Sequence, residues 1–172
     1  MRHAVASVLL LLVAGCGYRA RFDLPPHLRT FTVNTFRNKT LERNLDFEFT
    51  EALIHEIAVR TPLRVARPGE GDLVIDGEIE GFERHSVRRK RFDQKMEMRY
   101  LLSVNIEIRD TKQNAVFFRG RRLVEQSEIS LNLGESPREG RDAVVRELAR
   151  HVVGLAFELW PPKPSESTDR GG

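Results

Sequence analysis

An alternation of apolar and polar residues over 98–109 constrains the fold of this chain more than any other feature. One side of the alternation is wholly apolar: Met98, Tyr100, Leu102, Val104, Ile106 and Ile108. The other side holds a single apolar residue, Leu101, among charged and polar ones. Because successive side chains of a strand point to opposite faces, the pattern predicts a long strand with one buried and one solvated face.

Three further strands are expected. A polar turn at 110–114 leads into a returning strand from 115 to about 127, so the two long segments form a hairpin. Upstream, residues 72–79 place Leu73, Ile75 and Ile79 on one face, with Gly77 between them. The β-prone segment 30–33 predicts a short first strand.

Two helices are predicted from spacing and from start and stop signals. Residues from about 44 to 60 repeat Phe49, Leu53 and Ile57 every four positions, and Thr61-Pro62 ends this helix. A polar turn at 36–40 leads into it. Ser136, with Pro137 and Glu139 after it, forms a capping box that starts a second helix running to Trp160.

The order β-α-β-β-β-α predicts an α/β (α+β) two-layer sandwich with a mixed four-stranded sheet and both helices on one face. The strand-helix-strand unit should make the first two strands parallel, and the others should add as antiparallel neighbours. We expect one domain over 30–160. Residues 161–172 contain few apolar side chains and predict a disordered tail.

The segment Leu12-Val13-Ala14-Gly15-Cys16 closes a short apolar run and contains the only cysteine. It resembles the lipobox of bacterial lipoproteins, in which the cysteine receives a lipid and becomes the mature N-terminus. The run is too short to cross a bilayer, which takes about 20 residues. We therefore expect a signal peptide over 1–15, lipidation at Cys16 and a lipidated tether over 16–29. An ordinary secretory signal with an incidental cysteine is the alternative.

Further motifs resemble one family of lipoproteins. Gly17-Tyr18 follows the lipobox, Phe36 and Asn38 precede Thr50-Glu51-Ala52-Leu53, and Asp72-Leu73-Val74-Ile75 is followed by Gly77 and Ile79. Together with the order of elements from Cys16 to Trp160, these resemble the lipopolysaccharide (LPS)-assembly lipoproteins, the LptE-like proteins.

This resemblance implies a lipoprotein anchored in the outer membrane on its periplasmic side. Such a protein assists assembly of the LPS-translocating β-barrel, which is LptD-like, and delivery of lipopolysaccharide to the outer leaflet. The implied partners are that barrel, lipopolysaccharide and outer-membrane lipids. Two alternatives stay open: a structural lipoprotein of another envelope complex, such as a secretion or pilus machine, and a lipid-binding module that works alone.

The densest charge cluster runs from Arg84 to Lys95 and holds six cations against one acid, Asp93. The candidate residues for binding lipopolysaccharide phosphates are Arg88, Arg89, Lys90 and Arg91, because clustered arginines hold phosphate oxygens through charge-assisted hydrogen bonds. The alternative is a solvated hairpin end whose charges prevent edge pairing. Arg119, Arg121 and Arg122 would extend this cluster if they faced the same way, which Arg121 and Arg122 cannot both do.

No pattern indicates an enzyme. His55-Glu56 lacks the second histidine of the zinc-protease motif, because Val59 stands in its place. The carboxylates at Asp72, Asp76, Glu78 and Glu80 read as an ordinary solvated row. A formal charge of +3 is too small to indicate nucleic-acid binding. We expect no metal site, and no cofactor besides the lipid on Cys16.

Overall fold

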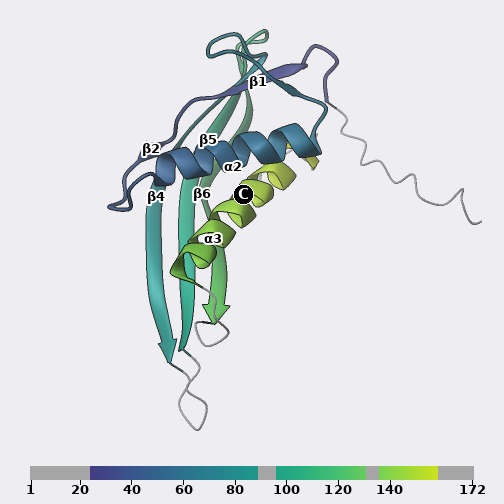
Figure 1. Cartoon of the computed structure of the whole chain (residues 1–172). Coiled ribbons are helices and arrows are strands. Elements are labelled where there is room, and N and C mark those ends of the chain that lie inside the picture. The colour runs from purple at the N-terminus through teal and green to yellow at the C-terminus, as the bar shows by residue number, and fades with distance from the viewer. Residues whose placement is uncertain (1–23, 89–95, 131–135, 159–172) are drawn as a thin grey trace, which may run out of the picture.

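The computed structural model describes residues 24–88, 96–130 and 136–158, and its elements form the predicted two-layer α/β arrangement (Figure 1). The strands are β1 (Thr30–Val33), β2 (Arg37–Asn38), β3 (Arg64–Val65), β4 (Leu73–Arg88), β5 (Met96–Asp110) and β6 (Ala115–Ser130). The helices are α2 (Leu45–Arg60) and α3 (Pro137–Val153), the latter followed by a π-helical turn, η2 (Gly154–Glu158). Cys16, the signal peptide and the tail fall outside the described residues.

The sheet is mixed, with the strand order β3-β1-β4-β5-β6 and with β2 beside β4. β1 runs parallel to β4, and β4, β5 and β6 are antiparallel neighbours, as the sequence predicts. The predicted count of four strands is wrong, because β2 and β3 bring it to six. β2 and β3 have only two residues each, which is too short for an alternation of apolar and polar residues to be recognised. In addition, β2 lies within the segment 36–40 that was predicted to be a polar turn.

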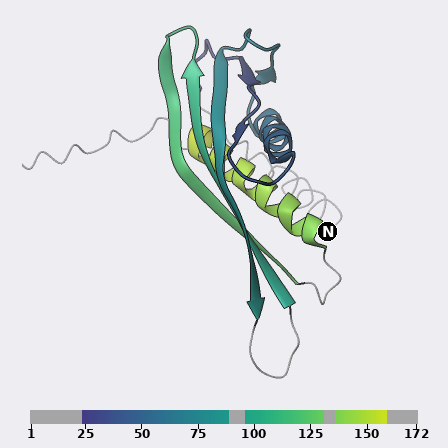
Figure 2. The same cartoon turned by 90° about the vertical axis from the view of Figure 1, so that its left-hand side faces the viewer.

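Both helices cover one face of the sheet, which Figure 2 shows from the side. On that face the β5 residues Tyr100, Leu102, Val104, Ile106 and Ile108 are buried, as the alternation predicts. The capping box is also confirmed. The Ser136 hydroxyl accepts a hydrogen bond from the Glu139 backbone N–H, and the Glu139 carboxylate accepts one from the Ser136 N–H.

Two glycines let aromatic rings lie directly between the layers. A Cβ atom on Gly77 would stand 2.3 Å from the Cε1 atom of Phe36, whose ring meets Phe49 of α2 edge-on with centroids 4.9 Å apart. A Cβ atom on Gly140 would stand 2.4 Å from a ring carbon of Tyr100. Both helices therefore approach the sheet more closely than an alanine at either position would permit.

β4 is longer than the sequence predicts. It continues through a bulge between Ile79 and Gly81 to Arg88, where the sequence predicted a loop from Arg84 onward. Arg84 thus lies on a strand, with its Nη2 atom 3.4 Å from a Glu42 carboxylate oxygen. The ends of β4 and β5 extend beyond α3 (Figure 1, Figure 2).

A partly buried carboxylate, that of Asp72, joins the first strand to the rest of the sheet. Asp72 Oδ2 accepts hydrogen bonds from the backbone N–H groups of Arg29 (2.8 Å) and Thr30 (2.9 Å), and Oδ1 lies 2.8 Å from Lys112 Nζ. Burial by itself would raise the pKa of Asp72, but hydrogen bonds from Lys112 and from the two backbone groups hold it well below its usual range.

The last residues of the segment read as a tether also contact this end of the sheet. His27 Nε2 lies 2.6 Å from Asp110 Oδ2, and Leu28 is buried in the core. Burial raises the pKa of Asp110, whereas the hydrogen bond with His27 lowers it. The net effect is a pKa below the usual value. The folded part of the chain therefore begins before β1.

Val104→Asp should lower the free energy of unfolding by about 4 kcal/mol, because it places an unpaired charge in the core. Arg99→Asp, on the open face of the same strand, should lower it by only about 1 kcal/mol, since the Arg99 ion pair with Glu128 is half-exposed. Urea denaturation of both variants measures the difference. Equal losses would contradict the assignment of faces on β5.

Asp72→Asn should lower the free energy of unfolding by about 2 kcal/mol at neutral pH. Because the folded-state pKa of Asp72 lies below the unfolded value of about 3.9, its contribution is complete above that value and declines as the pH falls through the folded pKa. The gap between wild type and Asp72→Asn should therefore narrow on acidification, as denaturation at several pH values would show. Asp142→Asn is the control, and a gap that stays constant with pH would contradict the role given to the Asp72 carboxylate.

Candidate functional site

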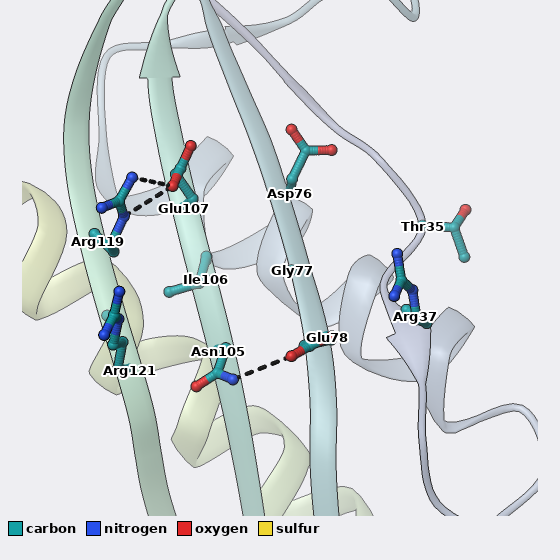
Figure 3. A pocket seen from close by; sticks show the side chains of 11 residues that line it. Thr35, Arg37, Asp76, Gly77, Glu78, Asn105, Ile106, Glu107, Arg119 and Arg121 are labelled. Carbon is teal, nitrogen blue, oxygen red and sulfur yellow. Dashed lines mark hydrogen bonds and ion pairs between the residues drawn. The ribbon is translucent and has the colours of Figure 1, made fainter.

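The face of the sheet without helices carries an open groove of about 860 Å³. Figure 3 shows it from the open side, with the helices behind the strands. The groove crosses β4, β5 and β6 and is bordered beyond β4 by Thr35 and by Arg37 of β2. Charged side chains of both signs line it.

The floor of the groove is bare backbone between two rows of polar side chains. Gly77, Ile106 and Gly120 are register partners on β4, β5 and β6. The side chain of Ile106 points toward the core, and the two glycines have none. The backbone of this row is therefore uncovered on the opposite face of the sheet. The neighbouring rows project outward from β4, β5 and β6. One row consists of Asp76, Glu107 and Arg119, and the other of Glu78, Asn105 and Arg121.

The carboxylates of the first row already have partners. Arg119 donates to Glu107 Oε2 through Nε (2.8 Å) and approaches it through Nη2 (2.6 Å). Asp76 accepts from the Asn34 side-chain amide (2.8 Å) and from Arg109 Nη2 (3.2 Å). The carboxylates of Asp76 and Glu107 are therefore each paired with an arginine.

The second row is organised by Glu78 and Asn105. Glu78 Oε1 accepts from Lys39 Nζ (2.8 Å) and from the Asn105 amide (3.2 Å). The hydrogen bond from Lys39, followed by the one from Asn105, lowers the pKa of Glu78, and the bond to Glu78 raises the pKa of Lys39. Glu78 is therefore ionised at neutral pH.

A β-bulge places Arg121 beside the groove. Arg121 and Arg122 together oppose Asn105, and Arg122 has the left-handed φ of 48°. The Arg122 backbone N–H donates to Asn105 Oδ1 at 2.7 Å. The extra residue restores the alternation, so that Leu123 pairs with Val104 on the core side while both arginines stay outside.

Two arginines of the groove remain without a direct partner. Among the residues that the structure describes, the side chains of Arg37 and Arg121 make no hydrogen bond or ion pair, although Arg37 is close enough to Glu78 to help lower its pKa. Both guanidinium groups can therefore donate hydrogen bonds to a ligand.

Of the predicted site residues, only Arg88 falls within the described part of the chain, and it does not line this groove. Arg88 is the last residue of β4, and Arg89, Lys90, Arg91 and Cys16 lie outside the described residues. At about 3.3 Å per residue, the backbones of Glu78 and Arg88 are about 33 Å apart along β4. Arg119 and Arg121 therefore do not extend the basic segment, and of Arg121 and Arg122 only the former lines the groove.

Three of the histidines, His27, His85 and His151, each lie beside a different carboxylate, and they do not gather at one site. His85 lies 2.8 Å from Glu83, and His151 of α3 lies 2.9 Å from Glu125 of β6. Within residues 24–88, 96–130 and 136–158, no group of three or more acidic, histidine or cysteine side chains is arranged to hold a metal ion. None of the helices described has the length and apolarity needed to cross a membrane.

The model of the LptE family, described as lipopolysaccharide-assembly, matches residues 28–154. The chain belongs to the LptE family. This confirms the resemblance found in the sequence motifs and makes the chain an LptE-like lipoprotein of the cell envelope, in a family that is not enzymatic. A comparison with curated protein sequences finds no match.

Solved structures similar to this LptE-family chain include two that are described as lipoproteins. The PelC dodecamer from Paraburkholderia phytofirmans is 14% identical, with 80% of this chain and 95% of that one covered and a TM-score of 0.49. Lipoprotein GNA1162 from Neisseria meningitidis is 9% identical (73% and 99% covered, TM-score 0.45), and a minor lipoprotein from Acinetobacter baumannii is 12% identical (77% and 92% covered, TM-score 0.42). At these scores the likenesses support no statement about function.

Thr35 and Arg37 are the groove residues that sequence reasoning missed. Arg37 lies in the segment 36–40 that was predicted to be a polar turn, and Thr35 directly precedes that segment. The parallel pairing of β2 with β4 brings this part of the chain to the border of the groove. The sequence does carry a signal for the outward residues of β5, because the alternation places Asn105 and Glu107 on the polar side of the strand. That signal indicates a polar face and gives no indication of a groove.

Proposed function

We propose that this chain is a lipoprotein anchored on the periplasmic side of the outer membrane that assists assembly of the LPS-translocating β-barrel and delivery of lipopolysaccharide to the outer leaflet. The observation that carries the proposal is the match to the lipopolysaccharide-assembly family over residues 28–154. The barrel partner, which is LptD-like, and the side of the membrane belong to the proposal.

The open face of the sheet is physically suited to such a partner. Interiors of large membrane barrels are polar, so a domain seated there needs a hydrophilic surface over a core of its own. The face opposite the helices presents ion pairs between neighbouring strands, such as Arg99 with Glu128 and Arg119 with Glu107. The core on the other face is complete without a partner, since β5 contributes five side chains that are at most 2% exposed.

We further propose Cys16 as the point of lipid attachment. Each buried CH₂ of an acyl chain contributes roughly 0.8 kcal/mol to membrane binding, and stable anchoring takes more than one chain. The described chain starts at Leu24, and His27 then contacts Asp110 at the end of β5. An anchor at Cys16 thus joins the domain at the end of the sheet where β4 begins.

The basic segment is the proposed lipopolysaccharide contact. Arg88 ends β4, and Arg89, Lys90 and Arg91 follow it in the chain. The β4–β5 ribbon that leads to this segment extends beyond α3 (Figure 2). Clustered arginines hold phosphate oxygens through charge-assisted hydrogen bonds, which is the chemical basis of this proposal.

The full-length chain, purified from detergent-solubilised outer membranes, should bring with it one large β-barrel protein in comparable amount. Mass spectrometry of the purified complex provides the measurement. Recovery of components of a secretion or pilus machine in place of a barrel would contradict the proposal and favour a structural role. Recovery of the chain with lipid alone would favour a stand-alone lipid-binding module.

The control in that preparation is Cys16→Ser. Because the core is complete without the lipid, this variant should give the circular dichroism of a folded protein and should leave the membrane fraction. If it stays in the membrane, the anchor is elsewhere.

Replacing Arg88, Arg89, Lys90 and Arg91 together with Ser should weaken lipopolysaccharide binding and leave the circular dichroism unchanged. Binding by wild type should also fall with salt, because exposed charges are screened over about 8 Å at physiological ionic strength. The matched control replaces four exposed arginines elsewhere with Ser, namely Arg64, Arg67, Arg138 and Arg146. Equal weakening by both sets would show that only net charge matters, and no weakening would leave the segment as a charged hairpin end.

A further inference from the structure

β6 forms a long edge of the sheet. It has 16 residues and pairs with β5 on one side, and beyond its other side the described residues place no strand (Figure 2). Such an edge presents backbone N–H and C=O groups that can pair with another strand. At the opposite end of the sheet, β3 has only two residues, which is too short for a comparable contact.

The outward charges of β6 are divided between its two halves. Arg119, Arg121 and Arg122 lie in the first half, and Glu128 lies in the second. Charges protect an edge strand from a second copy when like charges would meet. Opposite charges in the two halves have the reverse effect, because antiparallel pairing places the first half of each copy beside the second half of the other.

One antiparallel register matches these charges. It has a two-fold axis at Val124, and it leaves Arg122 unpaired because Arg122 is the extra residue of the bulge. The outward residues that face each other between the copies are then Val124 with Val124, Arg121 with Gln126, and Arg119 with Glu128. The bulge thus keeps the arginines on the face where they meet these residues.

The register also continues an alternation of charge across the open face. Within one copy, Arg119 forms an ion pair with Glu107, and Glu128 forms one with Arg99. The side chains of Arg119 and Glu128 are 49% and 46% exposed, so both are accessible to a second copy. Between the copies, neighbouring strands would then carry Glu107, Arg119, Glu128 and Arg99 in turn, and the two-fold axis repeats this series.

Val124 is the apolar centre of this register. Its side chain is 43% exposed, and antiparallel pairing at the axis would bring the two copies of it into contact. Other registers fit less well. An axis at Arg121 would place two arginines opposite each other, and an axis at Gln126 would place Val124 opposite Glu128.

We propose that β6 pairs with β6 of a second copy of this chain around a two-fold axis at Val124, so that the chain without its barrel is a dimer. The assembly closes at two copies, because the pairing uses the long edge of each sheet and leaves only the short β3 edge. A contact of about ten residues per copy is at the small end of protein interfaces, so the dimer should be reversible. The inference rests on β6 alone and goes beyond the proposed function.

Sedimentation equilibrium of the full-length chain, in a non-ionic detergent of matched density, tests the proposal. Wild type should show a reversible equilibrium between monomer and dimer. Val124→Lys places two like charges at the axis and should weaken association about tenfold or more. The matched control is Val65→Lys, which makes the same change at an exposed valine of β3 and should associate as wild type does. A monomeric wild type, an assembly larger than a dimer, or equal weakening by the control would overturn the proposal.

A second test exchanges the charges between copies. Arg119→Glu and Glu128→Arg should each weaken the homodimer about tenfold, because each places like charges together at two symmetric positions. An equimolar mixture of the two variants should form a heterodimer, since Glu at 119 then meets Arg at 128 and the unchanged pair remains. Disturbance within one copy would not be relieved by mixing, so a mixture that associates no better than its components would overturn the register.

Both tests use the chain without the barrel. Failure to dimerise would therefore overturn this inference alone, and the barrel partnership is decided separately by the purification from outer membranes.

Discussion

The structure depends on burying one face, and only one face, of a long three-stranded ribbon. β4, β5 and β6 present a continuous apolar surface on which Val104 and its neighbours are fully buried. The chain supplies α2 before this ribbon in sequence and α3 after it, and both cover the same face (Figure 2). Gly77 and Gly140 permit the close contact, because a side chain at either position would displace the ring of Phe36 or Tyr100.

One-sided burial leaves the opposite face free for polar contacts. Ion pairs there connect neighbouring strands, and pairs such as Arg119 with Glu107 contribute little to stability because they are exposed. Their arrangement is more informative than their strength. The carboxylates of the groove each accept from a cationic side chain, whereas Arg37 and Arg121 have no direct partner among the residues that the structure describes.

The length of the ribbon also separates the two ends of the sheet. At one end, Asp72 and Asp110 connect the segment before β1 to the sheet through Arg29, Thr30 and His27. At the other end, β4 finishes at Arg88, about 50 Å away at 3.3 Å per residue. A lipid on Cys16 would therefore hold the domain near one end, and the basic segment would act at the other. This separation fits a protein that is anchored to a membrane at one end and contacts its ligand at the opposite end.

By itself, the sequence determined which residues of β5 face the core, where α2 begins and ends, where α3 begins, and the family resemblance. Each of these depends on local spacing: a period of two in Tyr100 to Ile108, a period near four in Phe49 to Ile57, and the capping box at Ser136. Tertiary structure alone decided the pairing of β2, the continuation of β4 through Phe82 and Arg84, and the bulge at Arg121 and Arg122. Those features are set by the register of a neighbouring strand, which local periodicity does not encode, and for that reason the groove they form could not be read from the chain.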